Sequence, residues 1–373
     1  MPNPLQNMFG SIFKKAEGSV LGVDLGSSSI KLVQLKRKKG RAILETYGEI
    51  ALGPYNNTEV GRATNLTIEK LSVALKDLVK EANVTTNSCG LSIPISSSLI
   101  AFIKMPDVDD RQLEQMIPLE ARKYIPVAAS EVTINHWIIP KDESAFSEYQ
   151  NVEEKPTENS KDVVLVVVHN DAANKNTQIV KQAGLASSFS EIELFGSIRS
   201  VTEQSLSPQM IMDFGAGTAK IYIVERGILR ASHVINRGGQ DITLAISRSL
   251  SISFDEAEKV KKDNGLIGNI NGVALKDIVG VHTDYIFSEA RRVVANYQQK
   301  YNKNIGKVYM IGGGANLKGL TEETELNLQL PISLGHPFGK VEYPAFLENV
   351  LRDISPEFSV AVGLALRKLQ ESE

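Results

Sequence analysis

Residues 20–35 read VLGVDLGSSSIKLVQL. An apolar run reaches Asp24, turns through one glycine and three serines, and resumes as a second apolar run. This pattern predicts a buried strand, a tight polar turn and a returning strand. The N–H groups and hydroxyls of such a turn suit a phosphate, Gly26 allows close approach, and Asp24 could hold magnesium directly or through water. On this stretch alone, an ordinary serine-rich hairpin explains the pattern equally well.

Two further glycine-containing turns favour a ligand site. Residues 210–224 read MIMDFGAGTAKIYIV, which repeats the order of strand, acid, apolar residue, glycine, small polar turn and strand. Residues 308–316 read VYMIGGGAN, a strand that ends in three glycines before an expected helix. The acids Asp24 and Asp213 are 189 positions apart (213 − 24). We therefore expect a duplicated α/β domain with a ligand between its halves.

Composition limits the class of protein. The chain has 373 residues, of which 42% are hydrophobic, so it can form two domains with sizeable cores. Its net charge of −3 provides no overall basic field for nucleic acid or acidic lipid. The single cysteine, Cys89, excludes an internal disulfide and fits a reducing compartment. No apolar run approaches the roughly 20 residues that span a bilayer, and no secretory signal is recognisable, so we expect a cytoplasmic protein.

The first 18 residues form an expected N-terminal arm. Its apolar residues recur at i, i+3, i+4, i+7 and i+8, the spacing of one helix face, and they are Leu5, Met8, Phe9, Ile12 and Phe13. This face could lie on a membrane or a partner, or it could pack on the arm's own domain.

The remaining chain predicts two α/β halves, residues 19–205 and 206–373, with an extra block of about residues 89–163 inserted in the first. Expected strands cover residues 42–51, 91–105 with a break near 94–98, 132–138, 163–169 and 307–311. Expected helices cover residues 68–82, 110–124, 171–183, 191–202, 242–249, 281–301 and 358–369. Ser253 and Glu256 form a capping box for another helix, which ends at Gly265. The polar, acidic residues 141–161 predict a solvated loop, Pro118 should kink its helix, and Gly363 should lie on the packing face of a closing helix that returns to the first half.

These motifs resemble the actin-like ATPase superfamily. Two Asp-x-Gly hairpins and a late Gly-Gly-Gly loop resemble its nucleotide cradle, and the inserted block resembles the third subdomain of FtsA and PilM. Residues 21–35, and the EARKYIP run at 120–126 followed by Glu131 and Val132, look like the PilM version. The resemblance covers essentially residues 8–370, with Pro118 a departure from the usual helix-forming residue there. It implies an actin-like ATPase fold with two duplicated α/β domains around a nucleotide cleft.

The resemblance also implies ligands for that cleft, ATP and Mg²⁺. Asp24 and Asp213 would flank the magnesium. The residues implied to bind ATP are Gly26, Ser27, Ser28, Ser29 and Lys31 in the first hairpin, Gly215, Ala216, Gly217 and Thr218 in the second, Glu258 and Lys261 on a later helix, and Gly312, Gly313, Gly314 and Asn316 after the last strand. Glu258 and Lys261 could instead form a solvated ion pair. Glu193 could orient a hydrolytic water, or it could simply be a charge at a helix start, so turnover is expected to be weak at most.

PilM-like function would be that of a scaffold at the cytoplasmic face of the inner membrane. Such a scaffold would hold the N-terminal tail of a PilN-like inner-membrane protein and couple to the motor ATPases of a type IV pilus. The tail would lie in a groove between the first and inserted subdomains, for which Ile103 and Ile125 are candidate lining residues. No nucleic-acid partner is expected, and self-association is possible. An FtsA-like filament protein and a phosphoryl-transfer enzyme are the alternatives.

Overall fold

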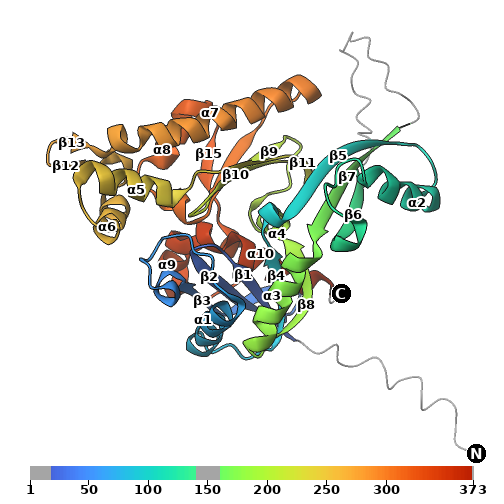
Figure 1. Ribbon diagram of the computed structural model, residues 1–373, viewed down its shortest axis with the longest axis horizontal. Coiled ribbons are helices and arrows are strands. Elements are labelled where there is room, and N and C mark those ends of the chain that lie inside the picture. Colours follow the sequence, from blue (N-terminus) through green and yellow to red (C-terminus); the bar gives the residue numbers. More distant parts are fainter. Residues whose placement is uncertain (1–17, 140–159, 372–373) are drawn as a thin grey trace, which may run out of the picture.

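The computed structural model describes residues 18–139 and 160–371. The apolar face of the N-terminal arm and nearly all of the predicted loop at 141–161 lie outside the described residues. In the part described, the strands form two five-stranded sheets, one three-stranded sheet and one two-stranded ribbon, and helices connect and cover them (Figure 1).

The two large sheets have matching topologies. The first has the order β3-β2-β1-β4-β8 and the second β11-β10-β9-β14-β15. The first comprises β1 (Ser19–Leu25), β2 (Ser29–Lys38), β3 (Arg41–Ala51), β4 (Ser88–Ile93) and β8 (Ala186–Ile192). The second comprises β9 (Gln209–Phe214), β10 (Ala219–Glu225), β11 (Ile228–Ile235), β14 (Lys307–Ile311) and β15 (Ile332–Leu334). In each sheet an antiparallel meander precedes two parallel strands, so the duplication predicted from the hairpins extends over both sheets.

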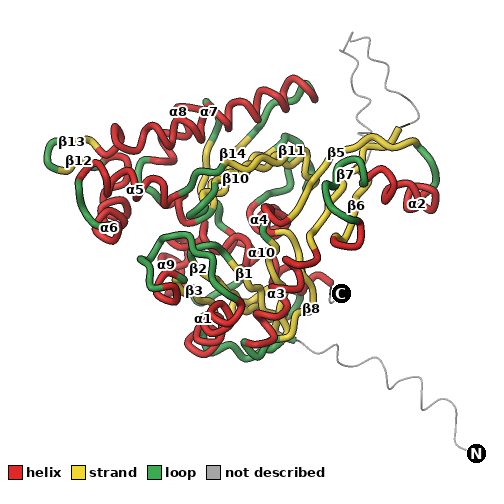
Figure 2. The backbone as a smooth tube through the Cα atoms, viewed as in Figure 1, coloured by secondary structure: helices red, strands yellow, loops and turns green. Residues whose placement is uncertain are grey.

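Helices cover both faces of the first sheet (Figure 2). Because side chains alternate along β1, Leu21 and Val23 pack with α1 (Ile68–Glu81) and α3 (Asn170–Gln182), whereas Val20 packs with α10 (Ser359–Glu371). Gly22 lies under α10, where a Cβ would come within 2.0 Å of the Ala361 carbonyl oxygen. The closing helix of the chain therefore packs on the first sheet.

The second sheet has its own helical layer. This layer comprises α5 (Gly239–Leu250), α6 (Phe254–Asn264), α7 (Leu275–Tyr301) and α8 (Leu320–Leu328), with the short strands β12 (Asn269–Ile270) and β13 (Val273–Ala274) between α6 and α7. A continuous apolar core joins it to the inward faces of β9, β10 and β14. The short helix α9 (Glu348–Ile354) precedes α10. The capping box of Ser253 and Glu256 at the start of α6 is confirmed, with both reciprocal bonds present.

Two glycines let α10 cross α4 (Glu193–Val201) at close range. A Cβ on Gly363 would lie 1.9 Å from the carbonyl oxygen of Gly196, and a Cβ on Gly196 would lie 3.0 Å from that of Val360. Gly363 therefore lies on a packing face, as the sequence predicted. The α4–α10 pair links the first half of the chain to its last helix.

The third sheet is a separate unit in the order β5-β7-β6, built from β5 (Ser98–Pro106), β6 (Val132–Ile139) and β7 (Ser160–His169). One face packs under α2 (Asp110–Ala121). The other shares an apolar cluster with α4 and the second sheet. Ile103 is buried beneath α2 and Ile125 packs against the same cluster, so the expectation that both line an exposed groove is wrong.

Three element predictions need correction. Strand β4 pairs with β1 and β8, so residues 88–93 belong to the first large sheet and not to the inserted unit. Strand β8 was missed because its sequence, ASSFSEI, carries three serines and little apolar character; pairing with β4 and the Ser188 hydroxyl donating to the Cys89 carbonyl stabilise it. Helix α7 begins six residues before the expected position of 281, since Leu275 and Val279 are buried in the core.

Candidate functional site

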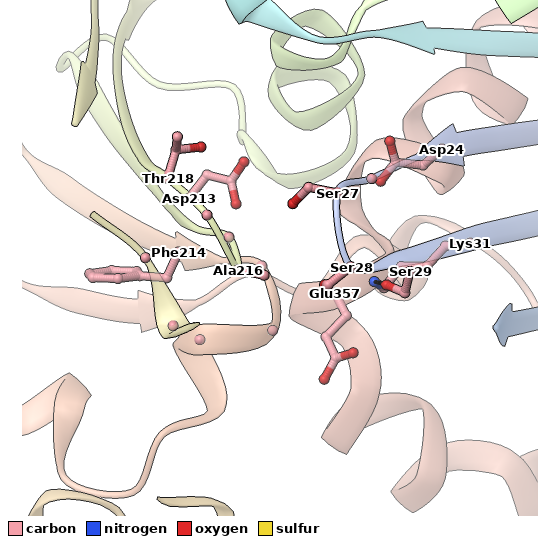
Figure 3. Close-up of a pocket in the computed structure, with 18 of the residues that line it drawn as sticks. Asp24, Ser27, Ser28, Ser29, Lys31, Asp213, Phe214, Ala216, Thr218 and Glu357 are labelled. Carbon is pink, nitrogen blue, oxygen red and sulfur yellow. Dashed lines mark hydrogen bonds between the residues drawn. The ribbon is translucent and has the colours of Figure 1, made fainter. Parts of the chain in front are cut away.

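The turns of the two hairpins line opposite sides of one cleft of about 1120 Å³ (Figure 3). All the residues that the sequence nominated for nucleotide, magnesium or catalysis line this cleft, from Asp24 in β1 to Asn316 after β14. A cleft of this size is ample for a nucleotide.

The two turns have the same local geometry. A Cβ on Gly26 would lie 2.8 Å from the Ser29 carbonyl oxygen, and a Cβ on Gly215 would lie 2.9 Å from that of Thr218. Both glycines are therefore required for a tight turn. Gly217, by contrast, has space in front of it: a Cβ there would lie 3.8 Å from the Ser27 hydroxyl of the other turn. Position 217 thus faces the gap between the two halves.

Each hairpin pairs its acid with a lysine on the returning strand. Asp24 is the register partner of Lys31, and Asp213 is the register partner of Lys220. Lys31 was nominated from the sequence, whereas Lys220 was missed. The equal spacing of seven positions (31 − 24 and 220 − 213) is the signal that could have identified it.

Lys220 is the centre of a buried charge network. Its Nζ lies 2.7 Å from Glu193 Oε2 and 3.2 Å from Asp213 Oδ2, and all three side chains are at most 13% exposed. Burial lowers the pKa of Lys220, but Asp213 and Glu193 outweigh it and raise that pKa well above its ordinary value. The ammonium is therefore a fixed positive charge on the cleft wall.

Both carboxylate oxygens of Glu193, at the start of α4, accept a hydrogen bond. Its Oε1 accepts a hydrogen bond of 2.9 Å from the Ile95 backbone N–H, and its Oε2 receives Lys220. Each oxygen keeps a second acceptor site, so the water-orienting role of Glu193 stays a prediction. Ile95 begins the 3₁₀ turn Ile95–Ser97 that leads from β4 into the inserted sheet. Glu193 therefore connects the cleft to the entry of that sheet.

Asp24 is the most perturbed acid in the cleft. Burial raises its pKa to about 6, with the negative charge of Glu193 adding to the effect and Lys31 opposing it. The Leu25 N–H next to it donates to the Ser92 hydroxyl at 2.9 Å, which fixes the end of β1. A cation placed beside Asp24 would favour its charged form.

The donor set fits magnesium bound together with a phosphate. Asp24 and Asp213 each supply one carboxylate, and Mg²⁺ in nucleotide sites is held by one or two carboxylates, water and phosphate oxygens. Across residues 18–139 and 160–371, no group of three or more His, Cys, Asp or Glu side chains could hold a metal ion by itself. Phosphate oxygens would thus have to complete the coordination.

Lys31 lies in a second buried cluster that includes two acids missed from the sequence. Its Nζ lies 2.8 Å from Glu49 Oε1 and donates to Ser29 Oγ at 2.6 Å. Glu357, just before α10, also lines the cleft, and burial with the neighbouring charge of Glu49 raises its pKa. Asn316 donates to Glu357 Oε1 at 3.2 Å, so the cluster joins the first hairpin to the Gly-Gly-Gly loop.

Glu258 and Lys261 form a mostly buried pair on α6, not a solvated one. Their charged atoms are 2.6 Å apart, and Thr243 on α5 donates to Glu258 Oε2 at 2.6 Å. Lys261 also donates to the Gly239 carbonyl at 3.2 Å. Burial raises the pKa of Glu258, but Lys261 outweighs it and the net shift is downward. These contacts hold two polar side chains toward the cleft from α6.

The start of α5 braces the second turn and reaches the first half. The Gly239 N–H donates to the Gly215 carbonyl and the Gln240 N–H to the Ala216 carbonyl, both at 2.9 Å. The side chain of Gln240 accepts from the Ala63 N–H at 3.2 Å. No functional role was predicted for this Gly-Gly-Gln segment.

The three glycines after β14 serve different purposes. Gly312 has φ +81°, and a Cβ there would lie 2.5 Å from Asp213 Oδ1. Gly314 packs against Phe214, whose Cβ would be 2.8 Å from an added Cβ. Gly313 has only ordinary contacts, the nearest at 3.7 Å in Glu357. Of these three glycines, all implied to bind ATP, only Gly313 therefore has an open face.

A family model described as type IV pilus assembly protein PilM matches residues 22–369, which include both hairpins, the inserted sheet and α10. The chain belongs to the PilM family. A chain of the solved PilM-PilN type IV pilus biogenesis complex has the same fold, with a TM-score of 0.77 and 22% identity over 95% of this chain and 99% of that chain.

More distant relatives extend the fold assignment beyond the PilM family. MreB 5 of Spiroplasma citri, solved with AMPPNP bound, has a TM-score of 0.50 and 12% identity over 95% of this chain and 98% of that chain. The cell division protein FtsA of Staphylococcus epidermidis is 26% identical over 259 residues, 66% of this chain and 54% of FtsA. This chain spans about half the length of the curated relatives it matches. The actin-like fold predicted from the hairpins is confirmed.

None of the helices within residues 18–139 and 160–371 is long and apolar enough to cross a bilayer.

Proposed function

We propose that this PilM-family chain binds Mg²⁺–ATP in its central cleft and serves as a cytoplasmic scaffold of the type IV pilus assembly platform. In this role it holds the N-terminal tail of a PilN-like inner-membrane protein and couples to the motor ATPases. The observation that carries the proposal is the convergence of both Asp-Gly hairpins and the glycine loop on one cleft, in a chain of this family.

Each side of the cleft has a distinct task. Backbone N–H groups and hydroxyls of the two turns would bind phosphates, with Lys31 and Lys220 nearby to balance their charge. Asp24 and Asp213 would hold the magnesium, which neutralises phosphate charge when bound. Glu258, Lys261 and Gly313 also line the cleft and would contact the ribose and base. Binding, rather than hydrolysis, is the function that this set of residues supports.

The first turn of α4 can transmit the state of the cleft to the inserted sheet. Glu193 contacts Lys220 on the cleft side and Ile95 on the side of the insertion. Two residues later, Phe195 contacts Trp137 of β6, with ring centroids 5.2 Å apart. A phosphate that attracts Lys220 would weaken the ion pair between Lys220 and Glu193. A shift of Glu193 would then alter the contacts of α4 with Ile95 and Trp137.

Strand β6 is the favoured docking place for the PilN-like tail. It forms one edge of the inserted sheet and so leaves backbone groups available to an added strand. Trp137 lies beside this edge at the joint with α4 and is 49% exposed. An extended peptide placed here would contact the inserted sheet and the first half together.

Titration calorimetry tests the proposal with a synthetic peptide of the cytoplasmic tail of a PilN-like protein encoded beside this one. Ordering a flexible tail opposes binding, so we expect a micromolar dissociation constant, which corresponds to a binding free energy of about −8 kcal/mol. Trp137→Ala should weaken the affinity for the peptide at least about tenfold and leave the affinity for ATP unchanged. The control is Phe346→Ala, which removes an aromatic ring that is 81% exposed in the second half of the chain.

Linkage supplies a second readout of the same experiment. If the cleft and the β6 edge are coupled, ATP must change the peptide affinity by the same factor as the peptide changes the ATP affinity. Lack of peptide binding both with and without ATP would reject the scaffold. ATP-dependent polymers seen by light scattering would favour the second candidate, an FtsA-like filament protein, which the similarity to FtsA supports.

A further inference from the structure

The turn between β2 and β3 concentrates positive charge. Residues 36–41 read KRKKGR, so five of six positions are cationic in a chain whose net charge is −3. Lys38 and Arg41 are direct partners across the hairpin, and the two residues between them, Lys39 and Gly40, have φ +51° and +78°. A two-residue turn of this kind matches the twist of the two strands and places Lys38, Lys39 and Arg41 together at the tip of the hairpin. We call residues 36–41 the basic turn.

The basic turn lies at the end of the first sheet that is remote from the cleft. β1 runs from Ser19, the partner of Lys36, to Leu25 beside the phosphate turn, a length of about 20 Å. The end of α10 reaches the same place, since Arg37 donates to the Leu369 carbonyl at 3.4 Å. A partner bound at the basic turn would therefore leave the cleft open.

Three charges of the basic turn are available to a partner. Lys38, Lys39 and Arg41 are exposed. Arg41 pairs with Glu342, but both side chains are largely solvated, and exposed pairs of this kind contribute little. Within the described part of the chain, no ion pair engages Lys38 or Lys39.

We propose that the basic turn is a docking surface for an anionic lipid bilayer. In the sequence, the apolar set of the N-terminal arm and the following Lys14 and Lys15 are joined to Ser19, and Ser19 is the register partner of Lys36 in the basic turn. The chain thus connects an apolar segment directly to the end of the sheet that carries the basic turn. Basic clusters of four to eight residues combined with an apolar segment bind anionic membranes, whereas nucleic acid needs no apolar segment. The net charge of the whole chain does not reveal the local positive charge of the basic turn. The proposal is independent of ATP and of a PilN-like partner.

Vesicle flotation of the full chain tests the docking surface. We expect binding to vesicles of phosphatidylglycerol and phosphatidylethanolamine, but not to vesicles of phosphatidylcholine, and loss of binding at high salt. Lys38→Gln combined with Lys39→Asn should weaken binding about 30-fold, because each basic residue near the surface contributes about fivefold. Asparagine is chosen because it tolerates the positive φ of position 39.

A matched control changes the same charge elsewhere. Lys70→Gln combined with Lys259→Gln removes two exposed lysines from α1 and α6, and vesicle binding should stay within about twofold of the wild type. Equal flotation of the basic-turn variant and the control would overturn the proposal, as would equal binding to neutral and anionic vesicles. Displacement of the protein from vesicles by a DNA duplex would also overturn it, in favour of nucleic acid.

Discussion

Gly363→Ala should destabilise the chain at the crossing of α4 and α10. The added Cβ would lie 1.9 Å from the Gly196 carbonyl oxygen, about 1.1 Å inside the 3.0 Å limit for real contacts (3.0 − 1.9). The atoms it meets are backbone, 2.4 Å and 2.6 Å away at the carbonyl carbon and Cα of Gly196, so no side-chain rotation can relieve the overlap. The helices must separate.

The size of the effect follows from two opposing terms. Overpacking costs about 1–3 kcal/mol, and a rigid backbone contact belongs at the upper end. Replacing a helical glycine by alanine returns about 1 kcal/mol. We therefore expect a net loss of about 2 kcal/mol in the free energy of unfolding. Weaker ATP binding should accompany it, since the helix that moves carries Glu193.

Thermal and urea unfolding of the two proteins measure this loss, with Gly280→Ala as control. Gly280 is also a helix residue, on α7, and a Cβ there would meet only Asp284 Oδ2 at 3.9 Å. This control should be neutral or more stable by up to about 1 kcal/mol. Gly363→Ala as stable as the control would refute the close crossing of the two helices.

Three further predictions concern individual side chains. Lys220→Met leaves Glu193 and Asp213 without their shared cation. The free energy of unfolding, measured by urea titration, should fall by about 3 kcal/mol. Adding Glu193→Gln should recover part of this loss. Asp213→Ala should abolish the stabilisation by magnesium-ATP in thermal scans, which is about 2.7 kcal/mol for the wild type at 100 times the dissociation constant. Cys89 is 1% exposed, and burial raises its pKa to about 12. Iodoacetamide should therefore label the folded chain about a thousandfold more slowly than the unfolded chain. Fast labelling of the folded chain would disprove this packing.

Local patterns in the sequence predicted those parts of the fold that local physics determines. Both hairpins, the strand at 307–311 and the capped start of α6 follow from apolar periodicity and turn chemistry, and the structure has them where they were expected. Strand β8 escaped because its stability comes from pairing with β4, not from its own serine-rich sequence. The burial of Ile103 was not predicted because the alternation of side chains along β5 does not indicate which face of the sheet α2 covers.

The candidate site divides in the same way. Each turn carries its own signature, so the residues of the two phosphate turns could be nominated from sequence. Glu357 joins the cluster of Lys31 and Glu49 across 308 positions (357 − 49), a separation at which no local pattern operates. The engagement of both Glu193 oxygens depends on Ile95 and Lys220, which belong to other strands and turns.

Calorimetric titration of magnesium-ATP into the full chain and its Gly217→Val variant tests the central claim most directly. A side chain at position 217 enters the space between the two turns without backbone strain, its nearest neighbour being Ala63 Cβ at 3.5 Å. We expect one binding site in the wild type, no measurable binding in the variant, and equal protection of Cys89 in both as the check that the fold is retained. No heat of binding in the wild type, or a folded variant that binds ATP as the wild type does, would contradict nucleotide binding between the two hairpins.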